Sequence, residues 1–189
     1  MLCCPFSHYG YVSGVLHEKR NPDEVMQMRQ GERRGGVGQE SINPYYEGAK
    51  YPEPTVCPRC GLTYHIGRWQ VAEEPPAKPA QKHHCPACRR AIDRYPAGWV
   101  YLSGSYMEEH HDEILRIARN QEAAAAASRP LQRILWIEQR SGRVEIATSN
   151  RHLAERIGKA IEGACKGTLQ VKRAPNAPLA RVYWERSNS

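Results

Sequence analysis

Two Cys-x-x-Cys pairs constrain this chain more than any other feature of its sequence. The first is Cys57 and Cys60 in CPRCG, and the second is Cys85 and Cys88 in HHCPAC. Structural zinc takes four nitrogen or sulfur ligands in a tetrahedron, and two paired knuckles supply that geometry. We therefore predict one bound Zn²⁺ ion with these four cysteines as its ligands.

The residues after the two pairs predict different local structures. Gly61 follows the first pair, and a glycine there allows the left-handed backbone conformation that this turn requires. Arg89 stands at the same position of the second pair, which would let that pair lead directly into a helical turn. A zinc ribbon and a treble clef both stay open, and His65, His83 or His84 could replace one cysteine.

Redox chemistry and catalysis are the alternatives to a structural metal. A redox-active Cys-x-x-Cys pair belongs between a strand and a helix of a βαβ unit, whereas Cys85 follows a loop rich in proline and lysine. A catalytic zinc keeps an open coordination position, which four thiolates would fill. The chain also lacks a P-loop, a dinucleotide fingerprint and a nucleophile elbow. The sequence thus predicts a protein that is not an enzyme and takes no small-molecule substrate.

The chain divides into three predicted parts. Residues 1–55 are broken by many prolines and glycines and are expected to form a flexible leader, with one helical turn near Asp23–Arg29. Residues 56–97 form the zinc-binding module, which a proline-rich loop interrupts. Residues 98–189 carry regular periodicity and form an α+β domain.

Two helices are predicted in that last part. The first begins at Ser105, where Ser-Tyr-Met-Glu is a capping box with Glu108, and runs through the alanines at 123–127. The second follows Asn150 as its cap and keeps a 3.6-residue apolar period. The strands are expected at 99–103, 133–139, 143–148, 168–173 and 179–186. This order, β-α-β-β-α-β plus one extra strand, predicts a ferredoxin-like antiparallel sandwich.

Alternation along these strands assigns side chains to the two faces of the sheet. The predicted helix-packed face carries Leu135, Ile137, Val144, Ile146, Leu169 and Val171. The opposite face is expected to carry Trp136, Arg143 and Lys172, with Arg181 and Tyr183 from the last strand. The third strand offers no aromatic residue, so base stacking of the kind seen in an RNA-recognition motif is not predicted.

Basic residues are concentrated from the first cysteine pair onward. Residues 57–104 hold 7 basic and 3 acidic side chains and residues 105–189 hold 14 and 10, so each segment carries +4, whereas residues 1–56 carry −1. Such an excess suits a polyanion, most often a nucleic acid. We predict RNA contacts from Arg59, Arg68, Trp69, Lys82, Arg89, Arg90, Arg94, Trp136, Arg143 and Lys172.

The sequence predicts a cytoplasmic protein without a membrane anchor. No apolar run approaches the ~18 residues that a membrane span needs, and the first residues lack the basic and apolar regions of a signal peptide. Disulfides are therefore not expected. Cys165, close to the apolar stripe of the second helix, is predicted to be a core thiol.

Three segments resemble an uncharacterised bacterial family of zinc-knuckle proteins: EPTVCPRCGLTYHIGRWQ, HHCPAC and RILWIEQRSGRVEIATS. The family's label is borrowed from the nonsense-mediated-decay (NMD)-type export adaptor of the large ribosomal subunit. That adaptor's zinc region looks like a double site with eight cysteines, whereas this chain offers four. The resemblance implies zinc ligation by Cys57, Cys60, Cys85 and Cys88 and association with the ribosome or ribosomal RNA. An export role does not carry over, because a bacterial cell has no nucleus.

These observations predict a non-enzymatic zinc protein that binds RNA, with ribosomal RNA as the favoured partner. The alternative is an adaptor or stress-regulatory factor whose zinc module docks another protein without direct contact to RNA.

Overall fold

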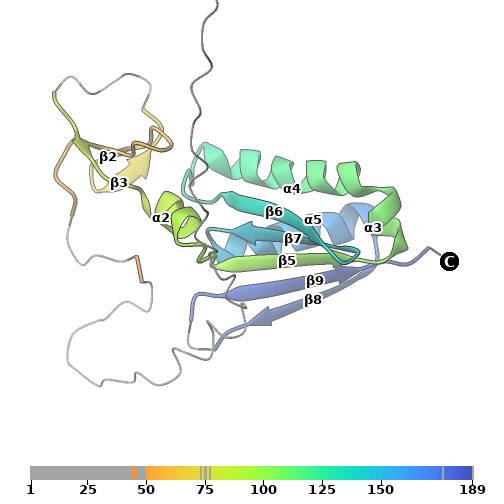
Figure 1. The fold of residues 1–189 in the computed structure, drawn as a ribbon. Helices are drawn as coiled ribbons and strands as arrows, with labels where there is room; N and C mark the ends of the chain where they lie inside the picture. The colour runs from red at the N-terminus through yellow and green to blue at the C-terminus, as the bar shows by residue number, and fades with distance from the viewer. Residues whose placement is uncertain are drawn as a thin grey trace, which may run out of the picture. The chain divides into compact units, whose positions relative to one another are not determined.

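The structure, a computed structural model, describes residues 44–45, 50–72, 74, 76, 78–175 and 177–188. All of them belong to one unit of the chain, residues 41–189. Most of the predicted leader, including the helical turn at Asp23–Arg29, lies outside the described residues. Within them the chain forms two mixed sheets and four helices, so the α+β class is confirmed (Figure 1).

The first sheet is small, and each cysteine pair follows one of its strands: the first pair follows β1 and the second follows β4. Its strands follow the order β3-β2-β1-β4, in which β1 and β4 are parallel and the other pairs antiparallel. Helix α2 follows β4 directly. The bounds are β1 Thr55–Val56, β2 Thr63–His65, β3 Arg68–Gln70, β4 Gln81–Lys82 and α2 Pro86–Ile92.

The second sheet has five strands in the order β6-β7-β5-β9-β8. In Figure 1 the helices α4 and α5 lie together on one face of this sheet, and α5 contacts β5, β7, β8 and β9. The bounds are β5 Gly98–Ser103, α3 Ser105–Glu109, α4 His111–Ala126, β6 Ile134–Arg140, β7 Arg143–Thr148, α5 Arg151–Cys165, β8 Thr168–Arg173 and β9 Ala180–Glu185.

The ferredoxin-like antiparallel sandwich is not confirmed, although the predicted order of elements is present. The first half agrees with it, because β7 lies between β5 and β6 and is antiparallel to both. The second half differs: β9 lies beside β5 and parallel to it, and β8 is displaced to the edge. The burial of the two strands gives the reason. Ala180, Val182 and Trp184 of β9 are fully buried, whereas no residue of β8 is, so β9 suits the inner position and β8 the edge.

Apolar side chains from one face of the five-stranded sheet meet α4 and α5 in a single core. Its fully buried members include Val100, Ile146, Ile157 and Trp184. Cys165 joins this core at 2% exposure, which confirms it as a core thiol. A second cluster surrounds the cysteine pairs and is described below.

Two local predictions were wrong. The helix expected to start with a capping box at Ser105 is instead split into α3 and α4 by His110, and no side chain caps either part. Ser105 is the first residue of α3 and Gly104 occupies the N-cap position, so the Ser105 hydroxyl is not placed as a cap; it accepts a hydrogen bond from the Asn188 amide. On β6 a register shift between Ile134 and Trp136 leaves Leu135 unpaired, and Ile134 packs against the core in its place.

Candidate metal centre and basic sheet face

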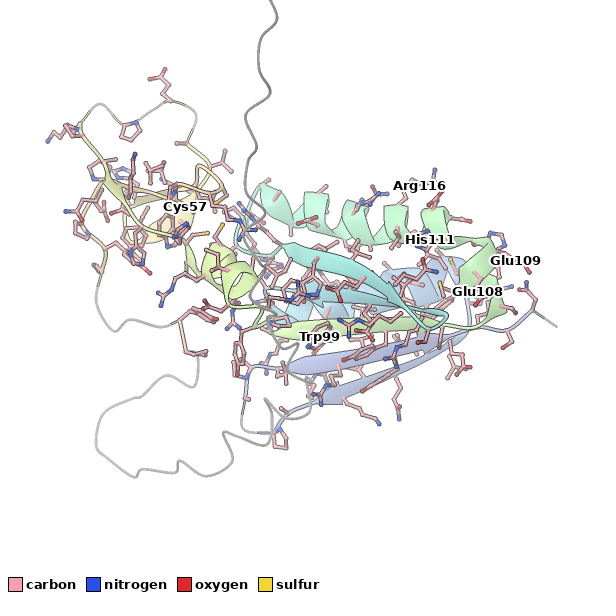
Figure 2. The ribbon with its side chains drawn as sticks, in the orientation of Figure 1. Cys57, Trp99, Glu108, Glu109, His111 and Arg116 are labelled. Atoms are coloured by element: carbon pink, nitrogen blue, oxygen red, sulfur yellow. The ribbon has the colours of Figure 1, made fainter. Side chains whose placement is uncertain are left out.

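The four cysteines of the two pairs converge in space. The sulfur atoms of Cys57, Cys60, Cys85 and Cys88 all lie within 4.8 Å of one another and could hold a metal ion. Cys57, Cys85 and Cys88 are buried, whereas Cys60 is half-buried. Figure 2 labels Cys57 at the small sheet, well apart from Trp99 on β5.

The parallel pairing of β1 with β4 brings the two cysteine pairs together, because the first pair follows β1 and the second follows β4. The first pair closes a tight turn in which the Leu62 carbonyl accepts from the Cys57 amide and Gly61 adopts a φ of 74°. The predicted glycine conformation is thus confirmed. Cys85 is the N-cap residue of α2, and Cys88 lies one turn into that helix. The order along the chain is therefore knuckle, hairpin β2–β3, second knuckle and helix.

The geometry fits a tetrahedral thiolate site. Zinc–sulfur bonds of ~2.3 Å at tetrahedral angles place the sulfur atoms about 3.8 Å apart, and the Cys60 and Cys85 sulfurs are 3.7 Å apart. Among the described residues, the cluster that could hold a metal consists of cysteines alone. His65 is exposed and pairs with Glu53 at 3.3 Å.

The pKa of one of these thiols is lowered, whereas the pKa of two others is raised. Burial opposes ionisation of Cys57, but backbone amides, including those of Cys85 and Arg59, donate to its sulfur and lower its pKa to about 7. Burial raises the pKa of Cys88 to about 11, and burial also raises the pKa of Cys85, with repulsion from neighbouring sulfurs adding to both. A divalent cation at the centre would replace this repulsion by attraction.

Arg133, in the segment before β6, reaches the cysteine cluster. Arg133 hydrogen-bonds to Cys60, and although desolvation lowers the Arg133 pKa, the nearby sulfurs outweigh that effect and raise it. Its backbone amide donates to Ser149 Oγ at 2.8 Å and its Nε donates to the Pro130 carbonyl at 2.9 Å. Leu131 packs against the same cluster. The segment before β6 therefore joins the cysteine cluster to the five-stranded sheet.

The second candidate site is the face of the five-stranded sheet turned away from α4 and α5. Strand pairing aligns Trp99 with Arg181, and Tyr101 with both Glu145 and Tyr183. These side chains alternate with the core residues on the same strands. We call this surface the basic sheet face and define it by its rings and cations: Trp99, Tyr101, Trp136, Tyr183, Arg94, Arg140, Arg143, Lys172 and Arg181.

The cations of this face are held by carboxylates and by aromatic rings. Glu138 accepts from both Arg94 and Arg140, and Arg143 Nη2 donates to Glu145 Oε1 at 2.6 Å. Hydrogen bonds from Arg140 and Arg94 outweigh desolvation and lower the Glu138 pKa. Glu138 therefore stays charged and fixes the guanidinium groups of Arg94 and Arg140 in place.

Sequence reasoning found most of the cations on this face but missed its central rings. Trp99 and Tyr101 were recognised as part of a strand, yet they were not assigned to a face because the sequence does not show that this strand is central. Their alternation with Val100 and Leu102 was the available signal. Trp136, Arg143 and Lys172 lie on the predicted face.

Arg94 reaches the basic sheet face from the end of α2. Its guanidinium carbon lies 4.5 Å from the centre of the Trp136 ring, and its Nη2 donates to Glu138. The residue has a φ of 49°, a left-handed conformation that turns the chain directly after the helix.

The predicted RNA-contacting residues of the zinc-binding module differ in how far they are exposed. Arg59, Arg68 and Lys82 are exposed. Arg89 is half-buried and lies 5.2 Å from the centre of the Tyr45 ring. The roles of these four residues stay predictions.

Trp69 and Arg90 were predicted to lie on the surface, and this prediction was wrong, because both side chains are buried. Trp69 is 7% exposed and belongs to the cluster around the cysteines, with the Tyr64 ring 5.5 Å away. Arg90 is 6% exposed, donates to the Tyr95 carbonyl and lies 4.6 Å from the centre of the Tyr45 ring. Neither side chain presents a face on which a base could stack.

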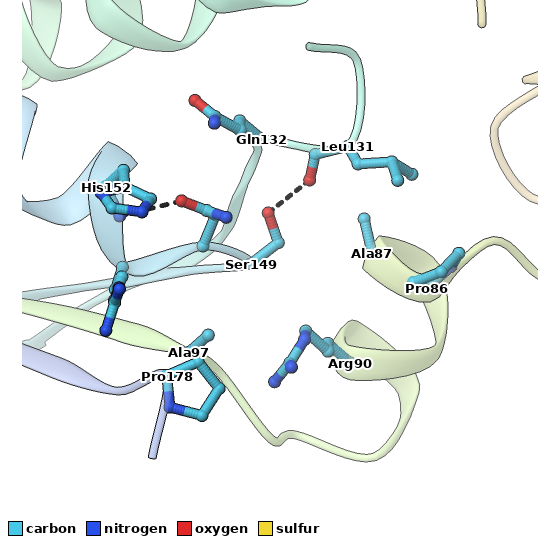
Figure 3. A pocket seen from close by; sticks show the side chains of 11 residues that line it. Pro86, Ala87, Arg90, Ala97, Leu131, Gln132, Ser149, His152 and Pro178 are labelled. Atoms are coloured by element: carbon cyan, nitrogen blue, oxygen red, sulfur yellow. Dashed lines mark hydrogen bonds between the residues drawn. The ribbon is translucent and has the colours of Figure 1, made fainter. Parts of the chain in front are cut away.

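A pocket of about 300 Å³ lies between α2 and the start of α5 (Figure 3). Much of the polar lining is engaged in structural bonds. Ser149 Oγ donates to the Leu131 carbonyl at 2.6 Å, and Asn150 Oδ1 accepts from the His152 amide at 2.8 Å as the predicted cap of α5. We assign no ligand to this pocket.

None of the helices in the described part of the chain has the length and apolar character that a membrane span requires. Comparison with known protein families, with curated proteins and with solved structures finds no match to this chain. The resemblance to the NMD-type bacterial family therefore stays a prediction.

Proposed function

We propose that this chain is a non-enzymatic zinc protein that binds RNA, with ribosomal RNA as its favoured partner, through the basic sheet face. The observation that carries this proposal is the convergence of five basic side chains around four aromatic rings on one sheet face. Phosphate contacts come from such cations, and their contribution to affinity falls steeply as salt rises.

The metal has a structural role in this proposal. Zn²⁺ bound by Cys57, Cys60, Cys85 and Cys88 would fill its coordination shell with thiolates, which is the composition of a structural site. The order of knuckle, hairpin and helix supports a treble clef over a zinc ribbon. The small sheet and α2 contain few apolar residues, so metal binding would supply much of their folding free energy.

Charge complementarity supports RNA as the partner. The basic sheet face holds five cations and the carboxylates of Glu138, Glu145 and Glu185, which leaves a positive excess on one surface. Lys172 is exposed and lies 5.2 Å from the centre of the Tyr183 ring, where it can reach a phosphate. Cytoplasmic location is part of the proposal, since disulfide formation would compete with metal binding at the four cysteines.

Co-sedimentation of the zinc-loaded chain with purified ribosomes, across a salt series, tests the proposal. We expect Lys172→Glu to weaken sedimentation, and the exposed Lys159→Glu on α5 to leave it unchanged as a matched control. Circular dichroism checks that both variants fold. Equal sedimentation of both variants, or sedimentation that does not respond to salt, would contradict RNA binding through this face.

A second candidate function is that of a protein–protein adaptor, and one feature of the small sheet favours it. Ile66 at the tip of the β2–β3 hairpin is 73% exposed and has a φ of 49°. A left-handed conformation is strained for a branched side chain. The two carboxylate oxygens of Glu53 accept from the amides of Ile66 and Gly67 at 2.9 and 3.0 Å. The fold thus holds an exposed isoleucine in a fixed position, as a docking element would require.

A further inference from the structure

The orientation of the rings on the basic sheet face narrows the kind of RNA that it can bind. We propose that this face binds the sugar–phosphate backbone of base-paired RNA rather than the bases of a single strand. The inference rests on the proposed function and names the class of its ligand.

Three of the four rings stack on one another, whereas Trp136 meets Trp99 edge-on, with an interplanar angle of 79° and centroids 5.7 Å apart. Trp99 and Tyr101 are parallel within 9° with centroids 6.0 Å apart, and Tyr101 and Tyr183 are within 19° with centroids 5.0 Å apart. Two rings lying flat and side by side could not approach to 5.0 Å without overlapping. Tyr101 is only 7% exposed, so it offers little surface on which a base could stack.

A basic side chain also lies over the ring of Tyr101, of Tyr183 and of Trp136. Arg143 lies 4.9 Å from the centre of the Tyr101 ring, Lys172 lies 5.2 Å from that of Tyr183, and Arg94 lies 4.5 Å from that of Trp136. A base that stacks on an aromatic side chain needs a free ring face. Here it would have to displace a cation that the ring attracts, so base stacking is disfavoured at each of these positions.

The same arrangement suits phosphate. A guanidinium or ammonium group held over a ring and anchored by a carboxylate loses little freedom when it meets a phosphate oxygen. Arg143 is anchored by Glu145, and Arg94 by Glu138. Base-paired RNA hides its bases and presents phosphates and 2′-hydroxyl groups, and it is recognised mainly through them. Because Tyr101, Tyr183 and Trp136 each carry a ring or a cation over a face, this surface loses little when the bases of the RNA are paired.

Fluorescence anisotropy with the zinc-loaded full chain tests this inference. The probes are an RNA hairpin with a stem of about 16 base pairs, the length that shape-reading domains span, and oligo(U) and oligo(A) strands of equal length. We expect the hairpin to bind at least as tightly as either strand, and the two strands to bind alike. One stacked base would favour a single strand by about 5-fold or more.

Two variants separate backbone contacts from base contacts. Lys172→Gln is expected to lower the slope of log affinity against log salt by about one on the hairpin, whereas Lys159→Gln on α5 should not change it. Tyr183→Leu is expected to change hairpin and single-strand affinity by the same factor. Tighter binding of a single strand by 5-fold or more, or a loss in Tyr183→Leu confined to single strands, overturns the inference and leaves RNA binding intact. Failure to bind any of these RNAs overturns the proposed function itself and favours the adaptor.

Discussion

Gly158 and Gly163 lie on the same helix, α5, and the same substitution should have opposite effects at the two positions. A Cβ atom at Gly158 would lie closer than 3.0 Å to Cγ1 of Val182 and 3.0 Å from Cδ1 of Leu169, whereas a Cβ at Gly163 meets nothing within 4 Å. Val182 is fully buried in the inner strand β9, and its short branched side chain cannot swing away.

The magnitudes follow from two opposing effects. Replacing a helical glycine by alanine favours the helix by about 1 kcal/mol, and overpacking a core costs about 1–3 kcal/mol. Gly163→Ala is thus expected to stabilise the protein by about 1 kcal/mol. Gly158→Ala should be less stable than Gly163→Ala by about 1–3 kcal/mol. In a domain of roughly 90 residues, such as residues 98–189, each kcal/mol shifts the melting temperature by about 4–8 °C.

Thermal and urea unfolding, followed by circular dichroism at constant zinc concentration, measures the difference. The double variant Gly158→Ala/Val182→Ala removes the methyl group that the new Cβ would meet. Its loss of stability should therefore be smaller than the sum of the two single losses. If Gly158→Ala and Gly163→Ala stabilise the protein equally, the close approach of α5 to β9 is refuted.

Three further predictions concern the metal centre and the surface. Zinc removal by a chelator should unfold residues 57–97 while the five-stranded sheet persists. Limited proteolysis would show this as early cleavage between residues 57 and 97 but not in the five-stranded sheet. Cleavage at equal rates in both would contradict the separation of the zinc-binding module from the five-stranded sheet. Arg133→Met should weaken zinc affinity by about 10-fold, the lower end of the range for residues that hydrogen-bond to metal ligands, in competition with a chromophoric chelator, and Arg133→Lys should weaken it less. Hydrogen bonds from Arg173 lower the pKa of Glu155 below 4.5; this pair therefore stabilises the folded state above pH 4.5 and less so as pH falls. Glu155→Gln should reduce the decline of stability below pH 4.5, and a decline equal to that of the wild type would refute the pairing.

Local patterns predicted several elements closely. The strands at 143–148 and 168–173 have the predicted bounds, and the helix capped by Asn150 begins at Arg151 as expected. The periodicity of these segments is a short-range property, so the sequence displays it directly. The capping box at Ser105 misled because the helix starts one residue earlier than the box requires, with Gly104 as its N-cap, and the Ser105 hydroxyl accepts from the distant Asn188 amide.

The cysteine quartet could be chosen from spacing alone, but its surroundings could not. The spacing of two Cys-x-x-Cys pairs identifies four candidate metal ligands, and this does not depend on the structure of the segment that connects the pairs. The approach of Arg133 depends on how the segment before β6 packs against the small module. The same packing of distant segments buries Trp69 and Arg90, which composition had suggested for the surface.

The sequence by itself determined the four cysteines that could hold a metal ion, the alternation of helices and strands, and the excess of positive charge after residue 56. Only the tertiary structure decided that β9 lies beside β5, that Tyr101 stacks with Trp99 and Tyr183, and that cations lie over the rings of Tyr183 and Trp136. Ligand spacing and periodicity are fixed by covalent neighbours within a few residues. The neighbour of a strand and the tilt of a ring are fixed by burial against partners tens of residues away.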